Sequence, residues 1–173
     1  MFEKFFPDFL IDKTQDIHYE FLKRNGIRGL ILDIDNTLVP NHVKEADEAV
    51  VRWMERIKSS GIKVCIVSNA SQKRVVKFNE RLKVYAIHRA NKPGTKNFLQ
   101  AARLMALEPK EIAVVGDQIF TDVYGGNKAE MKTILVKPID KREVLFVRLK
   151  RYPEKLILSK YRRKYGNSGK TKI

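Results

Sequence analysis

The sequence has one cysteine, no long apolar run and few acidic residues for its number of basic ones. Cys65, the single cysteine among 173 residues, excludes an internal disulfide, and its apolar neighbours predict a buried thiol. No apolar run approaches the roughly 18–20 residues that a membrane-spanning helix needs. Charged residues interrupt the N-terminal phenylalanines and no small-residue cleavage site follows, so we expect no signal peptide and a cytoplasmic location.

The shortage of acidic residues is concentrated near the C-terminus. Residues 128–173 contain 15 Lys and Arg against 4 Asp and Glu, whereas the first 127 residues contain 20 against 16. Such an excess attracts phosphate groups, whether in nucleic acid, anionic lipid or a substrate. We therefore distinguish a basic C-terminal segment, residues 141–173, and expect its tail, residues 166–173, to be disordered.

Strand and helix patterns alternate through the middle of the chain. Short apolar runs, several of them β-branched, predict strands, and apolar residues at helical spacing predict the helices between them. Repeated β-α-β units favour an α/β fold with a doubly wound parallel sheet and helices on both faces, in one domain of residues 1–173. The expected strands are residues 29–33, 63–67, 84–87, 112–116 and 133–136; the expected helices are 45–60, one capped by Ser71, 95–107 and 122–128.

Polar residues follow these strands, at the sheet edge where ligands of such folds bind. Asp33 and Asp35 follow the first strand, and two carboxylates this close raise each other's pKa unless a cation is present. Carboxylates suit Mg²⁺, and hydroxyl and ammonium groups suit phosphate, so the set predicts phosphoryl transfer. The other strand ends supply Ser68 and Asn69, then Arg89 and Lys92, then Gly116, Asp117 and Asp122.

The order and spacing of these residues resemble the haloacid dehalogenase superfamily of aspartate-nucleophile phosphatases. The four matching motifs are Asp33-x-Asp35-x-Thr37, Ser68, Lys92-Pro93, and Gly116-Asp117 with Asp122. The stretches around them, the Phe-Pro-Asp start and the basic end look like one branch, the type IIIA phosphatases called the YqeG family. That branch is similar to mitochondrial and plant phosphatidylglycerophosphate phosphatases, and the resemblance implies a Rossmann-like core.

The resemblance also implies a role for each motif residue. Asp33 is the expected nucleophile, and Asp35 the expected general acid and later base. The Asp33 carboxylate, the Asp35 backbone carbonyl and Asp117 would bind Mg²⁺, with Asp122 assisting. Ser68, the Asn69 backbone N–H and Lys92 would hold the phosphoryl oxygens.

For several of these residues a second interpretation stays open. Asp122 could cap the next helix, and Ser68 with Asn69 could do the same after the second strand. Possible substrate contacts are His42, Arg89 and Thr37, although a solvated side chain is the better explanation of Arg89. We read His18 and His88 as structural or exposed, and Gly125-Gly126 as permitting tight turns rather than cradling phosphate.

The spacing leaves no room for the cap domains that the superfamily inserts beside its active site. Asp33 and Ser68 lie 35 residues apart, which one helix and one strand nearly fill, and Ser68 and Lys92 lie 24 apart. A capless site suits a large or surface-presented substrate, because caps exclude water and select small metabolites. A partner subunit could still supply a lid.

The chain ends give two further expectations. The aromatic N-terminal segment, residues 1–28, serves either core packing or membrane anchoring. Pro153 is expected to break or kink a C-terminal helix, which either packs on the sheet or docks on anionic lipid. The favoured function is a Mg²⁺-dependent phosphomonoesterase of phosphatidylglycerophosphate, peripheral at the inner face of the membrane. A soluble phosphatase of nucleotides, sugar phosphates or phosphoproteins, a phosphotransferase and an RNA- or ribosome-associated protein remain alternatives; nucleic acid is not favoured because no RNA-binding motif appears.

Overall fold

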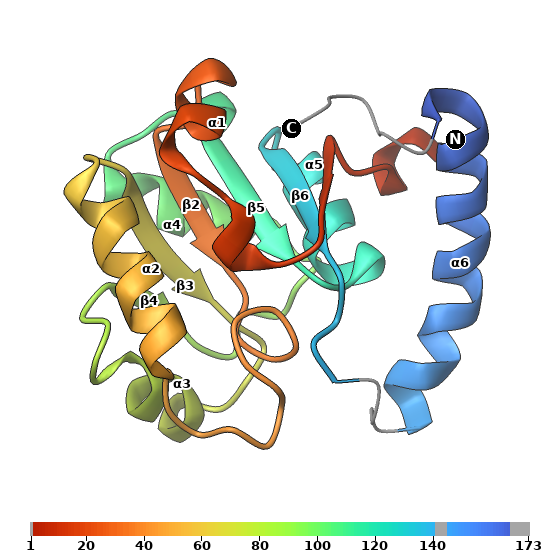
Figure 1. Ribbon diagram of the computed structural model, residues 1–173. Helices are drawn as coiled ribbons and strands as arrows, with labels where there is room; N and C mark the ends of the chain where they lie inside the picture. Colours follow the sequence, from red (N-terminus) through yellow and green to blue (C-terminus); the bar gives the residue numbers. More distant parts are fainter. Residues whose placement is uncertain (1, 141–144, 167–173) are drawn as a thin grey trace.

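The computed structural model describes residues 2–140 and 145–166, with side chains for 2–140 and 152–166 (Figure 1). A six-stranded sheet forms its centre, and every strand pair is parallel. Among the described residues no helix is both long and apolar enough to cross a bilayer. The strands, in the order in which they pair across the sheet, are β1 (Phe9–Ile11), β6 (Lys132–Val136), β5 (Ile112–Gly116), β2 (Gly29–Leu32), β3 (Lys63–Val67) and β4 (Tyr85–Ile87).

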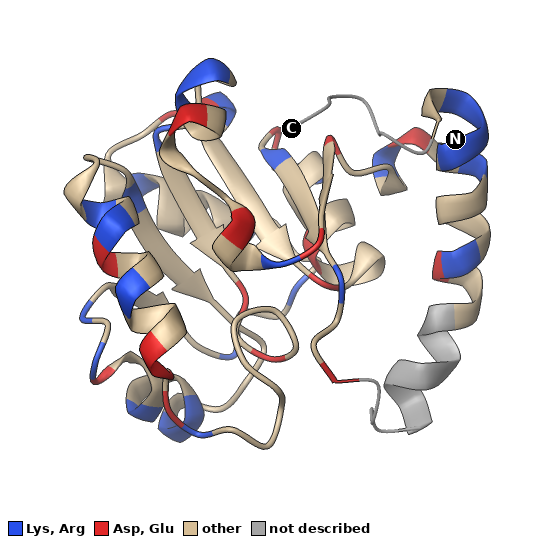
Figure 2. Ribbon diagram, viewed as in Figure 1, with Lys and Arg blue, Asp and Glu red and all other residues tan. Residues whose placement is uncertain are grey.

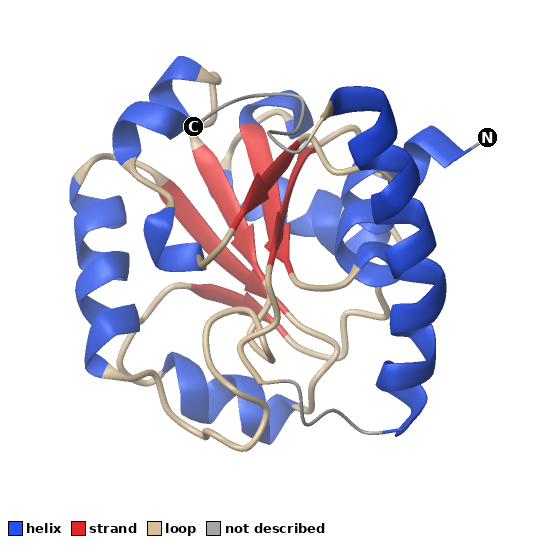
Figure 3. Ribbon diagram, turned by 45° about the vertical axis from the view of Figure 1, so that its right-hand side comes forward, coloured by secondary structure: helices blue, strands red, loops and turns tan. Residues whose placement is uncertain are grey.

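Helices cover both faces of this sheet (Figure 3). Alternate residues of a strand point to opposite faces, so Leu30 and Leu32 belong to one apolar cluster and Ile31 to another. The first cluster packs under α1 (Tyr19–Arg24), α2 (Glu48–Ser59) and α3 (Gln72–Asn79), and the second under α4 (Lys96–Met105). The doubly wound α/β fold expected from the sequence is confirmed.

A third apolar cluster lies beside β6 on the α4 side of the sheet. It joins Phe6, Leu135, Ile157 and Tyr161, and so attaches the long helix α6 (Leu145–Tyr165) to the body of the protein. The remaining elements are α5 (Tyr124–Lys128), the π-helical turn η4 (Ile119–Val123) and the 3₁₀ turns η1 (Phe2–Phe5), η2 (Thr14–Asp16) and η3 (Pro109–Glu111).

The N-terminal aromatics are mostly structural. Phe6 and Phe9 are buried, Phe5 stacks on Tyr124, and Phe2 is the exposed one. The strand β1, which the sequence pattern did not predict, pairs with β6 at the edge of the sheet. Core packing is therefore the correct reading for this part of the N-terminal segment.

Three local expectations need correction. The helix predicted from residue 45 begins at Glu48, because Asp47 caps it by accepting a hydrogen bond from the Val50 N–H. Of the break or kink expected at Pro153, the break is wrong, since α6 continues through it. The glycine pair Gly125-Gly126 lies inside α5 rather than in a turn. Of the tail expected to be disordered, Gly166 ends α6 with positive φ, and residues 167–173 lie outside the described residues.

The thiol of Cys65 is fully buried in β3, and burial raises its pKa to about 12. We expect iodoacetamide to leave it unmodified in the native protein at neutral pH, because the thiolate is the reactive form. Intact-mass spectrometry should show one adduct in guanidinium chloride and none without it. Native labelling as fast as that of the unfolded chain would contradict the buried placement.

The strand order has one reversal, between β2 and β5. From β2 the chain moves outward through β3 to β4, and then returns to place β5 on the other side of β2. In doubly wound sheets this switch point opens a crevice at the carboxyl ends of the two strands. The arrowheads of β2 and β5 point downward in Figure 1, and Asp33 and Asp117 follow the ends of these two strands.

Candidate active site

The loop after β2 places Asp33 and Asp35 in different surroundings. The backbone N–H of Asp33 donates to the Val115 carbonyl, which keeps residue 33 in line with the sheet. Asn36 then takes a left-handed φ of 60°, and its N–H donates to the Val39 carbonyl, closing a tight turn. Asp33 is consequently buried at the strand end, whereas the Asp35 side chain keeps 34% of its surface exposed.

Three buried carboxylates meet one buried lysine at the switch point. Asp33, Asp117 and Asp122 place carboxylate oxygens within 4.8 Å of one another. The Lys92 Nζ lies 2.9 Å from an Asp33 oxygen and 2.7 Å from an Asp122 oxygen. Residues from three separate strand ends thus form one cluster, which we call the acidic centre: Asp33, Asp117, Asp122 and Lys92.

Electrostatics in the acidic centre are dominated by burial and close charge. Burial raises the pKa of Asp122 to about 6, against the opposing charge of Lys92. For Lys92 burial acts to lower the pKa, but the nearby charges of Asp122 and Asp33 outweigh it and hold the pKa above its usual value. Lys92 is therefore a permanent cation beside three buried carboxylates.

The donor set fits a divalent cation. Three carboxylates and one ammonium share this buried space, and a divalent cation there would offset the excess of carboxylates. Carboxylate oxygens are the ligands that Mg²⁺ and similar hard cations prefer. The Asp35 carboxylate is not part of the acidic centre, so any contribution of Asp35 to metal binding is left to its backbone carbonyl.

Thr37 and Gly116 help to determine where two of the acidic carboxylates lie. The Thr37 hydroxyl, buried, donates to Asp117 Oδ1 at 3.3 Å, so it supports that carboxylate rather than reaching outward as a substrate contact. Gly116 leaves space for Asp122, since a Cβ at residue 116 would lie 2.2 Å from the Asp122 Cγ. The Asp122 carboxylate also accepts from the Gln118 N–H, which fixes it within its own loop.

Gly116→Ala should therefore lower activity strongly. The added methyl group would push Asp122 away from Lys92, and a displacement near 1 Å can cost roughly 10²-fold in rate. Phosphate release by the purified variant measures the loss. Gly26→Ala is the control, because it meets no atom within 4 Å and should change stability without a comparable loss of rate. Equal activity of Gly116→Ala and the parent would contradict the assigned role of Gly116.

Ser68 and Asn69 lie at the end of β3, beside the acidic centre. The buried Ser68 Oγ accepts the Ala70 N–H at 3.1 Å, an arrangement that leaves its own hydrogen for donation. The Asn69 side chain pairs twice with the Lys92 backbone, accepting its N–H at 2.8 Å and donating to its carbonyl at 3.3 Å. Asn69 thus positions the lysine loop, a function that the motif pattern did not reveal.

Asp35 has a partner that the sequence reasoning missed. Arg74, on the first turn of α3, donates from Nη2 to Asp35 Oδ1 at 2.9 Å. Burial raises the pKa of Asp35, although the hydrogen bond and charge of Arg74 act to lower it. The sequence places the helix capped by Ser71 at the same sheet edge as Asp35, but it does not indicate which side chain of that helix contacts Asp35.

The other two suggested substrate contacts, His42 and Arg89, are exposed side chains. His42 is 67% exposed and its Nδ1 lies 3.8 Å from an Asp140 carboxylate oxygen. Arg89 is exposed, with a left-handed φ of 46°. Among the described residues, neither forms an ion pair with the acidic centre. A substrate contact by His42 or Arg89 therefore stays a prediction.

Comparison with known proteins decides the family. The family model described as mitochondrial PGP phosphatase matches residues 2–140. The chain belongs to this family. It is a phosphatase of the haloacid dehalogenase type, as the motif resemblance predicted.

Two relatives support the membership of this chain in the PGP phosphatase family. The probable phosphatase YqeG of Bacillus subtilis (strain 168) is 41% identical over 165 residues, which cover 95% of this chain and 96% of that protein. The chloroplastic/mitochondrial phosphatidylglycerophosphate phosphatase 1 of Arabidopsis thaliana is 28% identical over 171 residues, covering 91% of this chain. The match spans 48% of the plant protein.

A solved structure supports the fold. The cobalt-bound deoxy-D-mannose-octulosonate 8-phosphate phosphatase of Haemophilus influenzae superposes with a TM-score of 0.55 at 13% identity. The similarity covers 79% of this chain and 90% of that chain. At this identity the likeness concerns the fold alone.

Proposed function

We propose that this family member is a Mg²⁺-dependent phosphomonoesterase that works through a phosphorylated Asp33. The observation that carries the proposal is the acidic centre, in which Asp33 stands at a strand end beside Lys92 with two further carboxylates. Asp33, Asp117, Asp122 and the Asp35 carbonyl would hold the cation. When bound, Mg²⁺ would offset the repulsion between the Asp33 carboxylate and a phosphate dianion.

The chain's own residues divide the reaction between them. The Asp33 carboxylate attacks phosphorus while the bond from phosphorus to the alcohol oxygen breaks, and the Asp35 carboxyl gives its proton to that oxygen. Asp35 then takes a proton from the water that attacks phospho-Asp33, which releases inorganic phosphate and restores Asp33. Asp35 is suited to both steps because its pKa lies above the usual range, so it carries a proton more readily.

Phosphoryl oxygens need donors, and the site offers several. Lys92 has three N–H donors, of which two face Asp33 and Asp122. The third can reach a phosphoryl oxygen, together with the Ser68 hydroxyl and the Asn69 backbone N–H. Such fixed donors stabilise charge that develops in the transition state, and losing one commonly costs roughly 10²–10³ in rate.

The proposed substrate is phosphatidylglycerophosphate at the inner face of a membrane. The Arabidopsis relative acts on this lipid by its name. The β2–β3 and β3–β4 connections hold α2 and α3 with their loops and no further helix or strand, which supports a capless domain with an open site. An open site accepts a headgroup presented at a surface.

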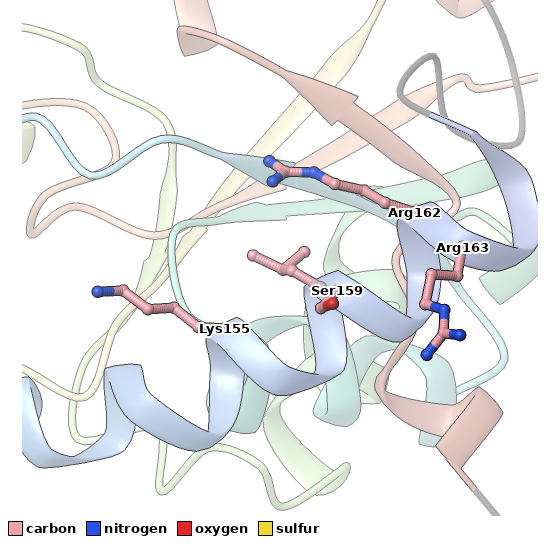
Figure 4. A pocket seen from close by; sticks show the side chains of 5 residues that line it. Lys155, Ser159, Arg162 and Arg163 are labelled. Carbon is pink, nitrogen blue, oxygen red and sulfur yellow. The ribbon is translucent and has the colours of Figure 1, made fainter.

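The exposed face of α6 supports peripheral membrane contact. Tyr152 and Leu156 are each 69% exposed on it, whereas Ile157 and Tyr161 face the core. Lys and Arg lie along the same helix (Figure 2), and a hollow of about 490 Å³ is lined by Lys155, Leu158, Ser159, Arg162 and Arg163 (Figure 4). Cations beside exposed apolar side chains suit the interface of an anionic bilayer.

Phosphate release from vesicles tests the substrate. Anionic vesicles that contain phosphatidylglycerophosphate should be hydrolysed with Mg²⁺ and not with EDTA, and faster than soluble nucleotides or sugar phosphates. Replacing Lys155, Arg162 and Arg163 together with Glu should reduce turnover on vesicles but not on soluble p-nitrophenyl phosphate. Brisk turnover of a soluble ester with none of the lipid would replace this substrate with a soluble one.

A further inference from the structure

One ion pair outside the acidic centre has no place in the proposed mechanism so far. Arg74 donates to Asp35 Oδ1 from Nη2 at 2.9 Å and from Nε at 3.3 Å. Both donors use the same carboxylate oxygen. Among the described residues no other side chain forms an ion pair or a hydrogen bond with the Asp35 carboxylate.

Arg74 is held firmly for an arginine. Its side chain is only 16% exposed, and its guanidinium carbon lies 5.6 Å from the centre of the Phe78 ring. The Ser71 hydroxyl caps α3 by accepting the Arg74 N–H, and Val75 and Phe78 anchor the helix in the core. The guanidinium is therefore a fixed group on a rigid element, whereas Asp35 sits in a turn.

The arrangement also has a cost. Arg74 Nη1 is buried and finds no hydrogen-bond partner among the described residues. A buried donor without a partner is unfavourable, so folding stability alone does not explain this placement. Function at Asp35 is the nearest explanation, since Asp35 is the group to which the other two nitrogens are committed.

We propose that Arg74 is the positioning residue of the general acid, holding Oδ1 of Asp35 so that Oδ2 carries the proton that is given to the leaving oxygen. This inference rests on the proposed phosphatase mechanism. The proton moves from Oδ2 to the alcohol oxygen as its bond to phosphorus breaks, and Arg74 itself neither gains nor loses a proton. Without Arg74 the Asp35 carboxyl would be free to rotate away from the leaving group.

Leaving-group dependence separates this role from others. An alkyl phosphate needs a proton as its alcohol leaves, whereas p-nitrophenolate leaves readily without one. For Arg74→Met we expect kcat/KM to fall roughly 10²-fold with glycerol phosphate and less than about threefold with p-nitrophenyl phosphate. The ratio kcat/KM depends only on the steps up to the first irreversible one, which is loss of the alcohol. Later hydrolysis of phospho-Asp33 therefore does not affect it. Arg74→Lys should recover part of the loss.

A double-mutant cycle with Asp35→Asn provides the second readout. If Arg74 acts through Asp35, Arg74→Met should change kcat/KM by no more than about twofold when residue 35 is already Asn. Lys73→Met, an exposed neighbour on α3, is the matched control and should behave as the parent on both substrates. Thermal unfolding of each variant shows whether the fold is kept.

The outcomes are distinct. Equal losses on the two substrates, or additive losses in the cycle, would overturn the inference and assign Arg74 to phosphate binding or to folding. No loss on either substrate would overturn it as well. An inactive parent, or an Asp33→Asn variant as active as the parent, would instead remove the proposed function and this inference with it.

Discussion

Asp33→Asn is expected to remove phosphatase activity, by roughly 10⁴-fold or more, as found when enzyme nucleophiles are replaced. An amide neither attacks phosphorus well nor supplies the charge that a cation and Lys92 require. The fold should survive, because Asn has nearly the same size and the backbone N–H of residue 33 keeps its bond to the Val115 carbonyl. Phosphate release measures the activity, and circular dichroism checks the fold.

The same variant tests where the phosphoryl group is carried. Acid-quenched parent enzyme with substrate should yield a peptide around Asp33 that is heavier by one phosphoryl group, and Asp33→Asn should not. Asp12→Asn is the matched control, since it removes an exposed carboxylate that pairs with Lys137 and should leave turnover unchanged. Turnover by Asp33→Asn at the parent's rate would contradict both the nucleophile and the mechanism.

The acidic centre could be predicted because its parts obey a topological rule. Asp33 and Asp117 each follow a strand, and parallel strands bring their carboxyl ends to one edge of the sheet. Residues far apart in the chain could therefore be predicted to lie close together in space, without any knowledge of side-chain positions. Lys92, 59 residues beyond Asp33 in the chain, lies 2.9 Å from it for the same reason.

Contacts that depend on side-chain geometry could not be predicted in this way. Arg74 and Asp35 are 39 residues apart, and no motif links them. Gly116 was expected to end a strand, but no pattern showed that its missing Cβ is needed so that Asp122 can pack against the strand. In Gly125 and Gly126 the requirement is again space, here for Phe98 and Thr133 against α5. Such constraints come from tertiary packing, which local propensity does not contain.

At the two chain ends, tertiary packing outweighs the local sequence preferences for secondary structure. The strand β1 has three residues, too few for a clear pattern, and it owes its existence to pairing with β6 across 125 residues of chain. Helix α6 continues through Pro153 although proline removes a helical hydrogen bond. Burial of Ile157 and Tyr161 in the third apolar cluster offsets that cost.

Helix α6 is also tied to the loop that carries Asp122. The buried carboxylate of Glu154 accepts the Ile119 N–H at 2.7 Å, at the start of η4. Asp122 lies within the same π-helical turn, a geometry that often occurs at functional sites. The helix proposed to meet the membrane is thus bonded directly to the segment that completes the acidic centre.

Lys92→Met is expected to weaken both the fold and the catalysis. The variant leaves Asp33 and Asp122 buried and facing each other without their common cation. Breaking a buried ion pair from one side costs about 3–5 kcal/mol, so the free energy of unfolding in metal-free buffer should fall by that amount. The rate should fall roughly 10²–10³-fold, because a donor to the phosphoryl group is lost.

Magnesium provides the sharper readout for this variant. Removal of the ammonium leaves three buried carboxylates without a counter-charge from Lys92, so added Mg²⁺ should raise the melting temperature of Lys92→Met more than that of the parent. Lys96→Met, an exposed lysine on α4, controls for the chemical change and should match the parent in both measurements. An unchanged free energy of unfolding, or a Mg²⁺ response equal to the parent's, would mean that Lys92 does not compensate the acidic centre. The combination of a large loss without metal and a larger gain with it follows only if lysine and cation act on the same carboxylates.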